Sequence, residues 1–209
     1  MLGNYMEKYN FTNLESHLKE KGYRVHIFED KETAADYIDS QIHQKTVGFG
    51  GSVTIQQMGL FKKLSSHNTV YWHDQKPDTM TIMETRTAAS RAEIYVSSVN
   101  GISEKGEIVN IDNTGNRVAA ISYGPSKVYL IIGSNKVAEN LEAAIYRARN
   151  IASPLNAKRL SRKTPCAVHG DKCYDCNSPE RICRNLSILW NKPTGAEYEI
   201  ILIQEELGY

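Results

Sequence analysis

Residues 127–150 have the sequence KVYLIIGSNKVAENLEAAIYRARN and contain the clearest strand and the clearest helix of the chain. The strand runs from Lys127 to Ile132 as an almost continuous apolar segment and is closed by Gly133. Strands that are apolar at successive positions are typical of parallel sheets covered by helices on both faces. Helical spacing follows over residues 137–150, so this stretch predicts a strand-to-helix unit of an α/β fold.

The same alternation of strand and helix continues on both sides of this stretch. Short strands are predicted over residues 24–28, 46–49, 69–72, 94–99, 107–111, 186–189 and 197–204. Helical spacing is found over residues 5–22, 31–44, 53–64, 79–91, 117–123 and 154–161. This order predicts one α/β domain over residues 1–209, with a mostly parallel central sheet flanked by helices. A cysteine-rich loop over about 161–185 is interpreted as an insertion within that domain.

The overall composition is that of an ordinary globular protein, with no sign of a nucleic-acid or membrane partner. Its 209 residues are 41% hydrophobic and 23% charged, and 25 basic against 24 acidic side chains give a formal net charge of +1. No basic stripe with interleaved aromatic residues is present, which argues against nucleic-acid binding. The longest apolar runs are too short to cross a bilayer and the first residues lack a secretory signal, so we expect a cytoplasmic protein. The oligomeric state stays open, with a homo-oligomer among the alternatives.

A glycine-rich turn follows the predicted strand over residues 46–49. Gly50 and Gly51 allow a ligand to approach the backbone closely, and Ser52 and Thr54 add hydroxyl groups at the start of the next helix. Free N–H groups at a helix N-terminus favour an anion such as phosphate or carboxylate, so the turn predicts an anion site. The glycine spacing matches neither the dinucleotide-binding fingerprint nor the P-loop. The alternative is a tight turn that only begins a helix.

More polar residues follow three other predicted strands, at the strand ends where ligands of open α/β sheets usually bind. The candidate ligand-binding residues in these segments are Asn100, Asp112, Gly115, Asn116, Arg117, Asn135 and Lys136. Arg117 can bind a carboxylate or phosphate through its planar guanidinium, and Asp112 is the natural acid or base. The alternative is that asparagine, aspartate and glycine are present only because they form turns.

All four cysteines lie within 18 residues, as Cys166, Cys173, Cys176 and Cys183. Four thiolates can bind a zinc ion or an iron–sulfur cluster, and His169 could replace one of them. This pattern predicts a metal site that stabilises the folded cysteine-rich loop. The alternative is four reduced thiols that pack as small apolar groups.

Several stretches together resemble the LUD-domain family, in particular its lactate-utilisation protein C group. They are GFGGSVT at 48–54, SVNGISEKGEIVNIDNTGNRVAA at 98–120, KVYLIIGSNKV at 127–137 and NIASPLNAKRL at 150–160. The segments TPC, KCYDCNSPERICR and EELGY complete a pattern that covers most of the chain. The resemblance implies the fold of the coenzyme A transferases and sugar-phosphate isomerases, with residues 50–54 and the segment around Asn100 facing the ligand.

The same resemblance implies a role in the oxidation of lactate to pyruvate beside iron–sulfur partner proteins. Our first hypothesis is an accessory component of lactate utilisation that binds a small anionic ligand. The second is an enzyme like the transferases or isomerases of this fold that uses Asp112, or Glu84 in place of the glutamate nucleophile of the transferases. Asn100 and Gly101 stand where the isomerases have acidic residues, and they cannot act as a general base. The third is a ligand-sensing module without catalysis.

Overall fold

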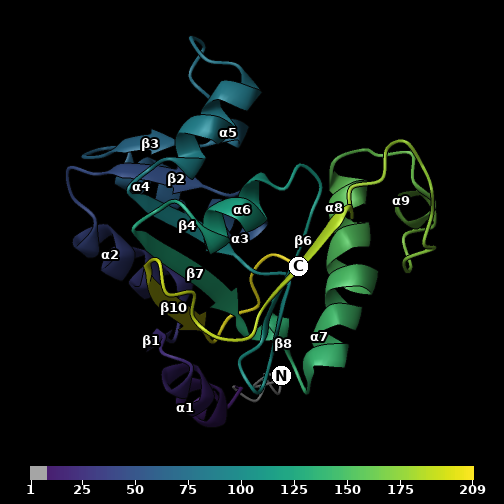
Figure 1. Cartoon of the computed structure of the whole chain (residues 1–209), viewed down its shortest axis with the longest axis horizontal. Coiled ribbons are helices and arrows are strands. Elements are labelled where there is room, and N and C mark those ends of the chain that lie inside the picture. The colour runs from purple at the N-terminus through teal and green to yellow at the C-terminus, as the bar shows by residue number, and fades with distance from the viewer. Residues whose placement is uncertain (1–8) are drawn as a thin grey trace, which may run out of the picture.

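The central sheet of the protein has six parallel strands. In the computed structural model, which describes residues 9–209, they lie in the order β1-β10-β7-β4-β2-β3 (Figure 1). Every neighbouring pair in this sheet is parallel. The bounds are Arg24–Phe28 (β1), Thr46–Phe49 (β2), Thr69–Tyr71 (β3), Ile94–Ser98 (β4), Lys127–Gly133 (β7) and Glu197–Ile203 (β10). The predicted α/β fold with a mostly parallel central sheet is confirmed.

A second sheet of four strands has the order β8-β5-β6-β9. Its strands are β5 (Gly101–Ser103), β6 (Ile108–Asp112), β8 (Val137–Ala138) and β9 (Asn185–Leu189). β6 pairs antiparallel with both β5 and β9, whereas β5 pairs parallel with β8. The strands predicted over residues 107–111 and 186–189 therefore belong to a separate sheet, which their apolar runs alone do not distinguish from the first.

Helices cover both faces of the central sheet (Figure 1). One face packs against α2 (Lys31–Gln41), α3 (Val53–Gln57) and α4 (Leu60–Leu64). The other packs against α1 (Thr12–Glu20), α5 (Ile82–Ser90) and α6 (Asn116–Ser122). The remaining helical segments are η1 (His73–Gln75), η2 (Ser134–Lys136), α7 (Leu141–Arg147), η3 (Ala148–Ala152), α8 (Ser153–Arg159) and α9 (Pro165–His169).

Strand β7 shows why its sequence is apolar at successive positions. Tyr129 and Ile131 point into the core under α2, α3 and α4. Val128, Leu130 and Ile132 point into the core on the opposite face. Because side chains alternate along a strand, only a strand covered on both faces buries every one of them.

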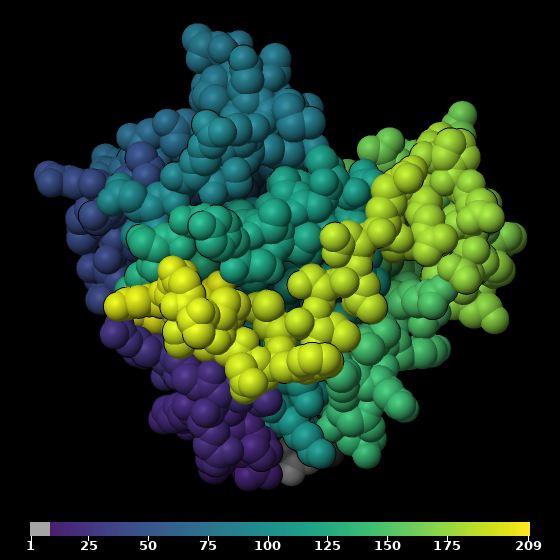
Figure 2. Space-filling view, in the orientation of Figure 1, coloured from purple at the N-terminus to yellow at the C-terminus, as the bar shows by residue number. Residues whose placement is uncertain are grey.

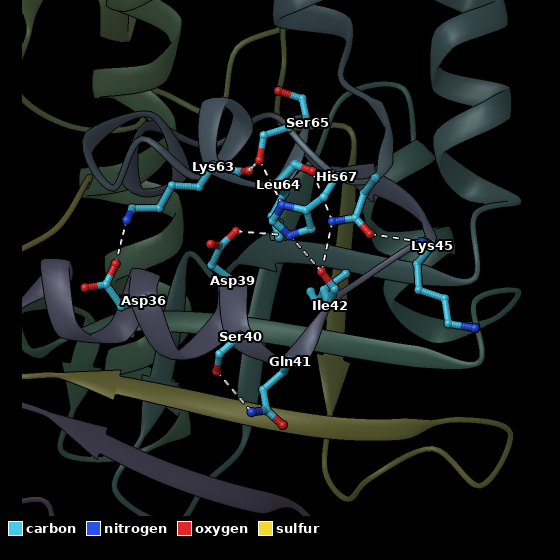
Figure 3. A network of polar contacts seen from close by, with 12 residues as sticks. Asp36, Asp39, Ser40, Gln41, Ile42, Lys45, Lys63, Leu64, Ser65 and His67 are labelled. Carbon is cyan, nitrogen blue, oxygen red and sulfur yellow. Dashed lines mark hydrogen bonds and ion pairs between the residues drawn. The ribbon is translucent and has the colours of Figure 1, made fainter.

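A small polar network fixes α2 and α4 over their face of the sheet (Figure 3). Asn68 Nδ2 donates to the carbonyl of Ile42 at 2.9 Å and to the carbonyl of Leu64 at 3.0 Å. Its Oδ1 accepts from the backbone N–H of Lys45 at 2.9 Å. The carbonyl groups at the ends of the two helices are thus satisfied by one side chain, as buried or half-buried helix ends require.

Two predicted helices, over residues 137–150 and 154–161, form one longer helix. It begins at Leu141, after Asn140, whose side chain accepts a hydrogen bond from the N–H of Ala143 at 2.9 Å. The prediction of a break was wrong, because the π-helical segment η3 joins α7 directly to α8. Proline lacks the N–H that a regular turn needs, and a wider turn before Pro154 accommodates the missing bond. The helix predicted over residues 53–64 is instead divided into α3 and α4 at Gly59, where φ is 63°.

The predicted N-terminal helix over residues 5–22 is observed as α1, and its first four positions lie outside the described residues. Over residues 9–209, no helix is long and apolar enough to cross a membrane. Figure 2 shows the C-terminal part of the chain, in yellow, crossing the front of the molecule toward the lobe formed by the long helix and the cysteine-rich segment.

Candidate functional site

A pocket of about 330 Å³ opens near the carboxyl ends of the strands. The segments that follow β2, β4, β6 and β7 all contribute to its wall, and α8 and the C-terminal residues Gly208 and Tyr209 complete it. Ligands of open α/β sheets bind at this end of the strands. The pocket is therefore the candidate site that the fold itself points to.

Most of the predicted ligand-binding residues meet at this pocket although they are far apart in the sequence. Eight of them line it, namely Gly51, Ser52, Thr54, Asn100, Asp112, Asn116, Arg117 and Lys136. Gly50, Gly115 and Asn135 do not line it and lie behind its wall or beside it.

These three residues have structural roles that support the pocket. Gly50 lies against Arg117, because a Cβ at position 50 would come within 2.9 Å of Arg117 Cδ. Gly115 adopts a left-handed conformation, with φ 86°, directly before α6. Asn135 Oδ1 accepts a hydrogen bond from the N–H of Leu207 at 3.1 Å and thereby holds the C-terminal segment in place.

The positive charge of the pocket comes from side chains. Ser52 Oγ accepts from the N–H of Ile55 at 3.3 Å and begins α3, but this helix has only five residues and contributes little dipole. Four arginines, Arg86, Arg117, Arg159 and Arg162, and the amine of Lys136 line the pocket, against two acidic residues, Asp74 and Asp112. An anion is therefore the ligand that the charges favour.

Lys136 is the most unusual of these side chains because it is buried and has no carboxylate partner within residues 9–209. The residue is 2% exposed, and its Nζ donates to Thr54 Oγ1 at 2.9 Å and to Ser98 Oγ at 2.6 Å. Burial lowers the pKa of the Lys136 amine well below its usual range, and the nearby guanidinium groups of Arg147 and Arg117 lower it further. A buried cation without a counter-ion is costly, so the amine is poised to lose its proton or to meet an anion.

Arg117 holds the pocket wall together. Its Nη1 donates to the carbonyl of Ser98 at 3.1 Å and to Asn110 Oδ1, and its Nη2 donates to Asn100 Oδ1 at 2.9 Å and to the carbonyl of Ile111 at 2.7 Å. The guanidinium fork that the sequence predicted for a ligand is thus used to join the ends of β4 and β6. Arg117 therefore contributes positive charge to the pocket and fixes the shape of its wall, besides any contact that its Nε makes with a ligand.

Asp112 lies at the end of β6, where its carboxylate accepts backbone hydrogen bonds. Oδ2 accepts from the N–H groups of Arg117 at 3.0 Å and Val118 at 3.1 Å, and Oδ1 accepts from the N–H of Asn113 at 2.7 Å. These contacts begin α6 in the way that a helix-capping aspartate does. The carboxylate also lines the pocket, where it can accept a hydrogen bond from a ligand hydroxyl.

His73 lines the pocket although it is not among the predicted site residues. Its side chain is 13% exposed, its Nε2 lies 3.6 Å from Asp74 Oδ1, and its Nδ1 is buried without a hydrogen-bond partner among residues 9–209. Burial lowers the pKa of the His73 imidazole, and Arg86 and Arg159 also lower it. His73, Arg86 and Arg159 come from segments that are far apart in the sequence and share no motif. The only local signals in the sequence are the adjacent His73 and Asp74 and the turn that contains them.

Glu84, the second candidate acid, does not line the pocket. Its carboxylate accepts from the backbone N–H and the hydroxyl of Thr81, both at 2.8 Å, while the N–H of Glu84 donates to Thr81 Oγ1 at 3.2 Å. This reciprocal pair is a capping box at the start of α5. The structure thus gives Glu84 a clear structural role and brings it to none of the other candidate residues.

The four cysteines are free, and each is half-buried. Among residues 9–209, no group of three or more histidine, cysteine, aspartate or glutamate side chains is close enough to hold a metal ion. The Cys173 thiol instead accepts hydrogen bonds from Arg149 Nε at 3.4 Å and from the N–H of Asp175 at 3.3 Å. In this arrangement Cys166, Cys176 and Cys183 do not join it in a ligand set, and the zinc or iron–sulfur site stays a prediction.

Comparisons with known proteins agree with this fold. The crystal structure of a DUF162 family protein from Deinococcus radiodurans matches with a TM-score of 0.53 and 10% sequence identity, covering 91% of this chain and 94% of that chain. No curated protein matches the sequence. The family model of the LUD domain matches residues 12–203, which is nearly the whole chain, and the protein therefore belongs to the LUD-domain family.

Proposed function

We propose that the protein binds a small carboxylate, of the 2-hydroxy or 2-oxo acid class, as an accessory component of lactate utilisation. The observation that carries this proposal is Lys136, a buried amine in the pocket wall that has no carboxylate partner in the part of the chain that the structure describes. The excess of arginine over acidic side chains around the pocket favours a carboxylate, and a carboxylate beside Lys136 would be the charge partner that the protonated amine lacks.

The other groups of the pocket suit an acid of this size. Apolar side chains such as Ile82 and Ile182 can contact a methyl group, while Asn116 and Asp112 can hydrogen-bond a hydroxyl or carbonyl oxygen. Small-molecule sites typically combine an apolar lining with a few convergent polar groups. Lactate and pyruvate, which the family resemblance suggests, both have a carboxylate, a methyl group and one further oxygen.

A cytoplasmic location and metal-containing partners belong to the same proposal. Four free cysteines suit a reducing compartment. A zinc ion or iron–sulfur cluster on the cysteines would require the segment after α9 to rearrange, since the thiols are not gathered. Iron and zinc contents of protein purified without oxygen test this part separately from the pocket.

Isothermal titration calorimetry with lactate, pyruvate, acetate and inorganic phosphate tests the proposed ligand class. We expect lactate or pyruvate to bind to the wild-type protein and at least tenfold more weakly to Lys136→Met, which keeps the length of the side chain and removes its nitrogen. Glu84→Gln is the matched control, because Glu84 lies outside the pocket. Absence of binding by both acids, or equal binding by wild type and Lys136→Met, would overturn the proposal.

A further inference from the structure

The hydrogen bonds around Lys136 indicate which protonation state the folded protein holds. Thr54 Oγ1 donates to the carbonyl of Leu207 at 3.2 Å, and Ser98 Oγ donates to the carbonyl of Ile131 at 2.6 Å. A hydroxyl has one proton to donate. Both hydroxyls have thus given theirs to carbonyl groups, and toward Lys136 they can only accept.

A neutral amine matches this environment better than an ammonium group. A neutral amine has two N–H bonds and one lone pair, so it donates to both hydroxyls and keeps the lone pair. An ammonium has three N–H bonds, and over residues 9–209 Nζ has hydrogen bonds to Thr54 and Ser98 only. The cationic side chains of Arg117 and Arg147 also disfavour a third positive charge beside them.

Lys127 is a second partly buried amine that differs from Lys136. Lys127 is also partly shielded, but its Nζ lies 2.8 Å from the buried carboxylate of Glu199 and has a charge partner. An amine that pairs with a carboxylate stays protonated and is a poor nucleophile. Lys136 has no carboxylate partner over residues 9–209, and in its neutral form it keeps a lone pair at the wall of a pocket with cationic surroundings, which are the conditions that activate lysine for attack on carbonyl compounds.

We propose that Lys136 forms an imine with the carbonyl carbon of a 2-oxo acid, such as pyruvate, bound in this pocket. The inference rests on the proposed function, because the carboxylate of the acid must be held by the cationic pocket for its carbonyl to face Nζ. It adds a covalent step that binding alone does not require, and it makes Lys136 the catalytic residue of the site.

The step is balanced without an oxidant or a reductant. The lone pair of Nζ attacks C2 of the acid, a C–N bond forms, and the carbonyl oxygen takes a proton to give a carbinolamine. Loss of that hydroxyl as water, with one proton from the nitrogen, leaves the C=N bond of the imine. One water molecule is released for each acid bound, and hydrolysis returns the free amine. When it is protonated to an iminium, the imine draws electrons from the neighbouring bonds of the acid. The reaction class of the site would therefore be bond breaking or proton exchange at the carbon next to the former carbonyl.

Reductive trapping tests the imine on the full-length wild-type protein. The protein is incubated with pyruvate and sodium cyanoborohydride, digested, and mapped by mass spectrometry for lysines that carry the reduced adduct. We expect one adduct per chain, on Lys136, with Lys127 as the internal control that stays unmodified. Excess lactate, which has no carbonyl group, should occupy the same pocket and slow the trapping. Lys136→Arg should give no adduct above the background of the exposed lysines.

The outcomes separate this inference from the proposed function. Calorimetric binding of pyruvate with no adduct on Lys136 would overturn the imine and leave anion binding intact. Absence of both binding and adduct would overturn both. Adducts spread evenly over exposed lysines would also overturn the imine, because they would show only the general reactivity of amines. The test does not depend on the folding of a variant, since the position of the adduct is measured on wild-type protein.

Discussion

Lys136 Nζ and Ser98 Oγ lie 2.6 Å apart, which joins the turn after β7 to the end of the neighbouring strand β4. The contact brings a buried amine to the strand ends, where an α/β sheet usually receives its ligand. The fold tolerates this amine although it has no charge partner within the described residues. A polar group held at such a cost is typical of a functional site.

Replacing Lys136 by methionine should stabilise the protein at neutral pH. The unfolded chain holds a proton on this amine up to about pH 10.4, whereas burial lowers the pKa in the folded protein. The unfolded state therefore binds more protons, and wild-type stability rises with pH between the lowered pKa and about 10.4. We expect Lys136→Met to be more stable by about 1–3 kcal/mol near pH 7, because a buried ionisable group is replaced by an apolar one of similar volume.

Urea unfolding of both proteins near pH 7 and near pH 9 measures this effect. The advantage of Lys136→Met should shrink at the higher pH, because the cost of deprotonating the amine on folding becomes smaller. An advantage that is equal at both pH values would show that folding does not change the protonation of Lys136.

The sequence predicts the central sheet well because each strand carries its own signal. Val128 to Ile132 are apolar at successive positions, and the structure buries all of them between two helical layers. The predicted site residues converge for a related reason, since the segments that follow parallel strands reach the same edge of the sheet. Asn100, Asp112 and Lys136 line one pocket even though no contact between them can be read from spacing.

Other parts of the site depend on tertiary packing that a pattern does not contain. Asn156 and Arg159 face the pocket only because η3 continues α7 into α8 across Pro154, where the sequence predicts a new helix. The position of Arg117 in the sequence predicts a ligand-binding residue, yet its Nη groups bind the backbone and two asparagines. Local sequence cannot show how many hydrogen bonds of a side chain are already satisfied.

Gly50→Ala should weaken both the fold and ligand binding. A Cβ at position 50 would lie 2.8 Å from Ser97 Oγ and 2.9 Å from Arg117 Cδ, so Arg117 must shift away from β2. We expect a loss of about 1–3 kcal/mol in the free energy of unfolding, as for other overpacked sites. Gly195→Ala is the matched control, because a Cβ there meets nothing within 4 Å. Equal melting temperatures for the two variants would contradict the close packing of Gly50 on Arg117.

Glu84→Gln should leave pocket chemistry unchanged. The side chain forms the capping box of α5 with Thr81 and does not line the pocket. We expect a small drop in melting temperature, since glutamine can still reach the N-cap N–H but without the charge that favours a helix N-terminus. Pyruvate affinity and adduct formation should match wild type. A large loss of either would restore Glu84 as a candidate catalytic acid.

Asp112→Asn separates a catalytic or binding role of the carboxylate from a capping role. Asparagine can still accept from the N–H groups of Arg117 and Val118 but loses one oxygen acceptor, so we expect a loss of about 1 kcal/mol in stability. Removing a negative charge from the pocket should raise the affinity for pyruvate, as measured by calorimetry. If Asp112 accepts from a ligand hydroxyl, lactate should gain less affinity than pyruvate. Loss of binding by both acids would contradict this electrostatic account.

Anion binding should depend on pH through His73. Burial holds the pKa of the His73 imidazole below its ordinary value of about 6.5. In mild acid the unfolded chain therefore binds a proton at this position more readily than the folded protein does, and His73 lowers stability as pH falls below about 6.5. A carboxylate in the pocket would favour the imidazolium and raise its pKa, because opposite charges stabilise each other.

Binding should then take up protons, and the affinity for lactate, which cannot form an imine with Lys136, should increase as pH falls from about 7 toward about 5. His73→Gln should lose most of this increase while it keeps its affinity near pH 7, where His73 is neutral. Calorimetry in buffers of different ionisation enthalpy measures the proton uptake directly. The His73 imidazole has a buried Nδ1 without a hydrogen-bond partner over residues 9–209. Equal pH dependence in wild type and His73→Gln would show that this imidazole does not interact with the charge of the bound ligand.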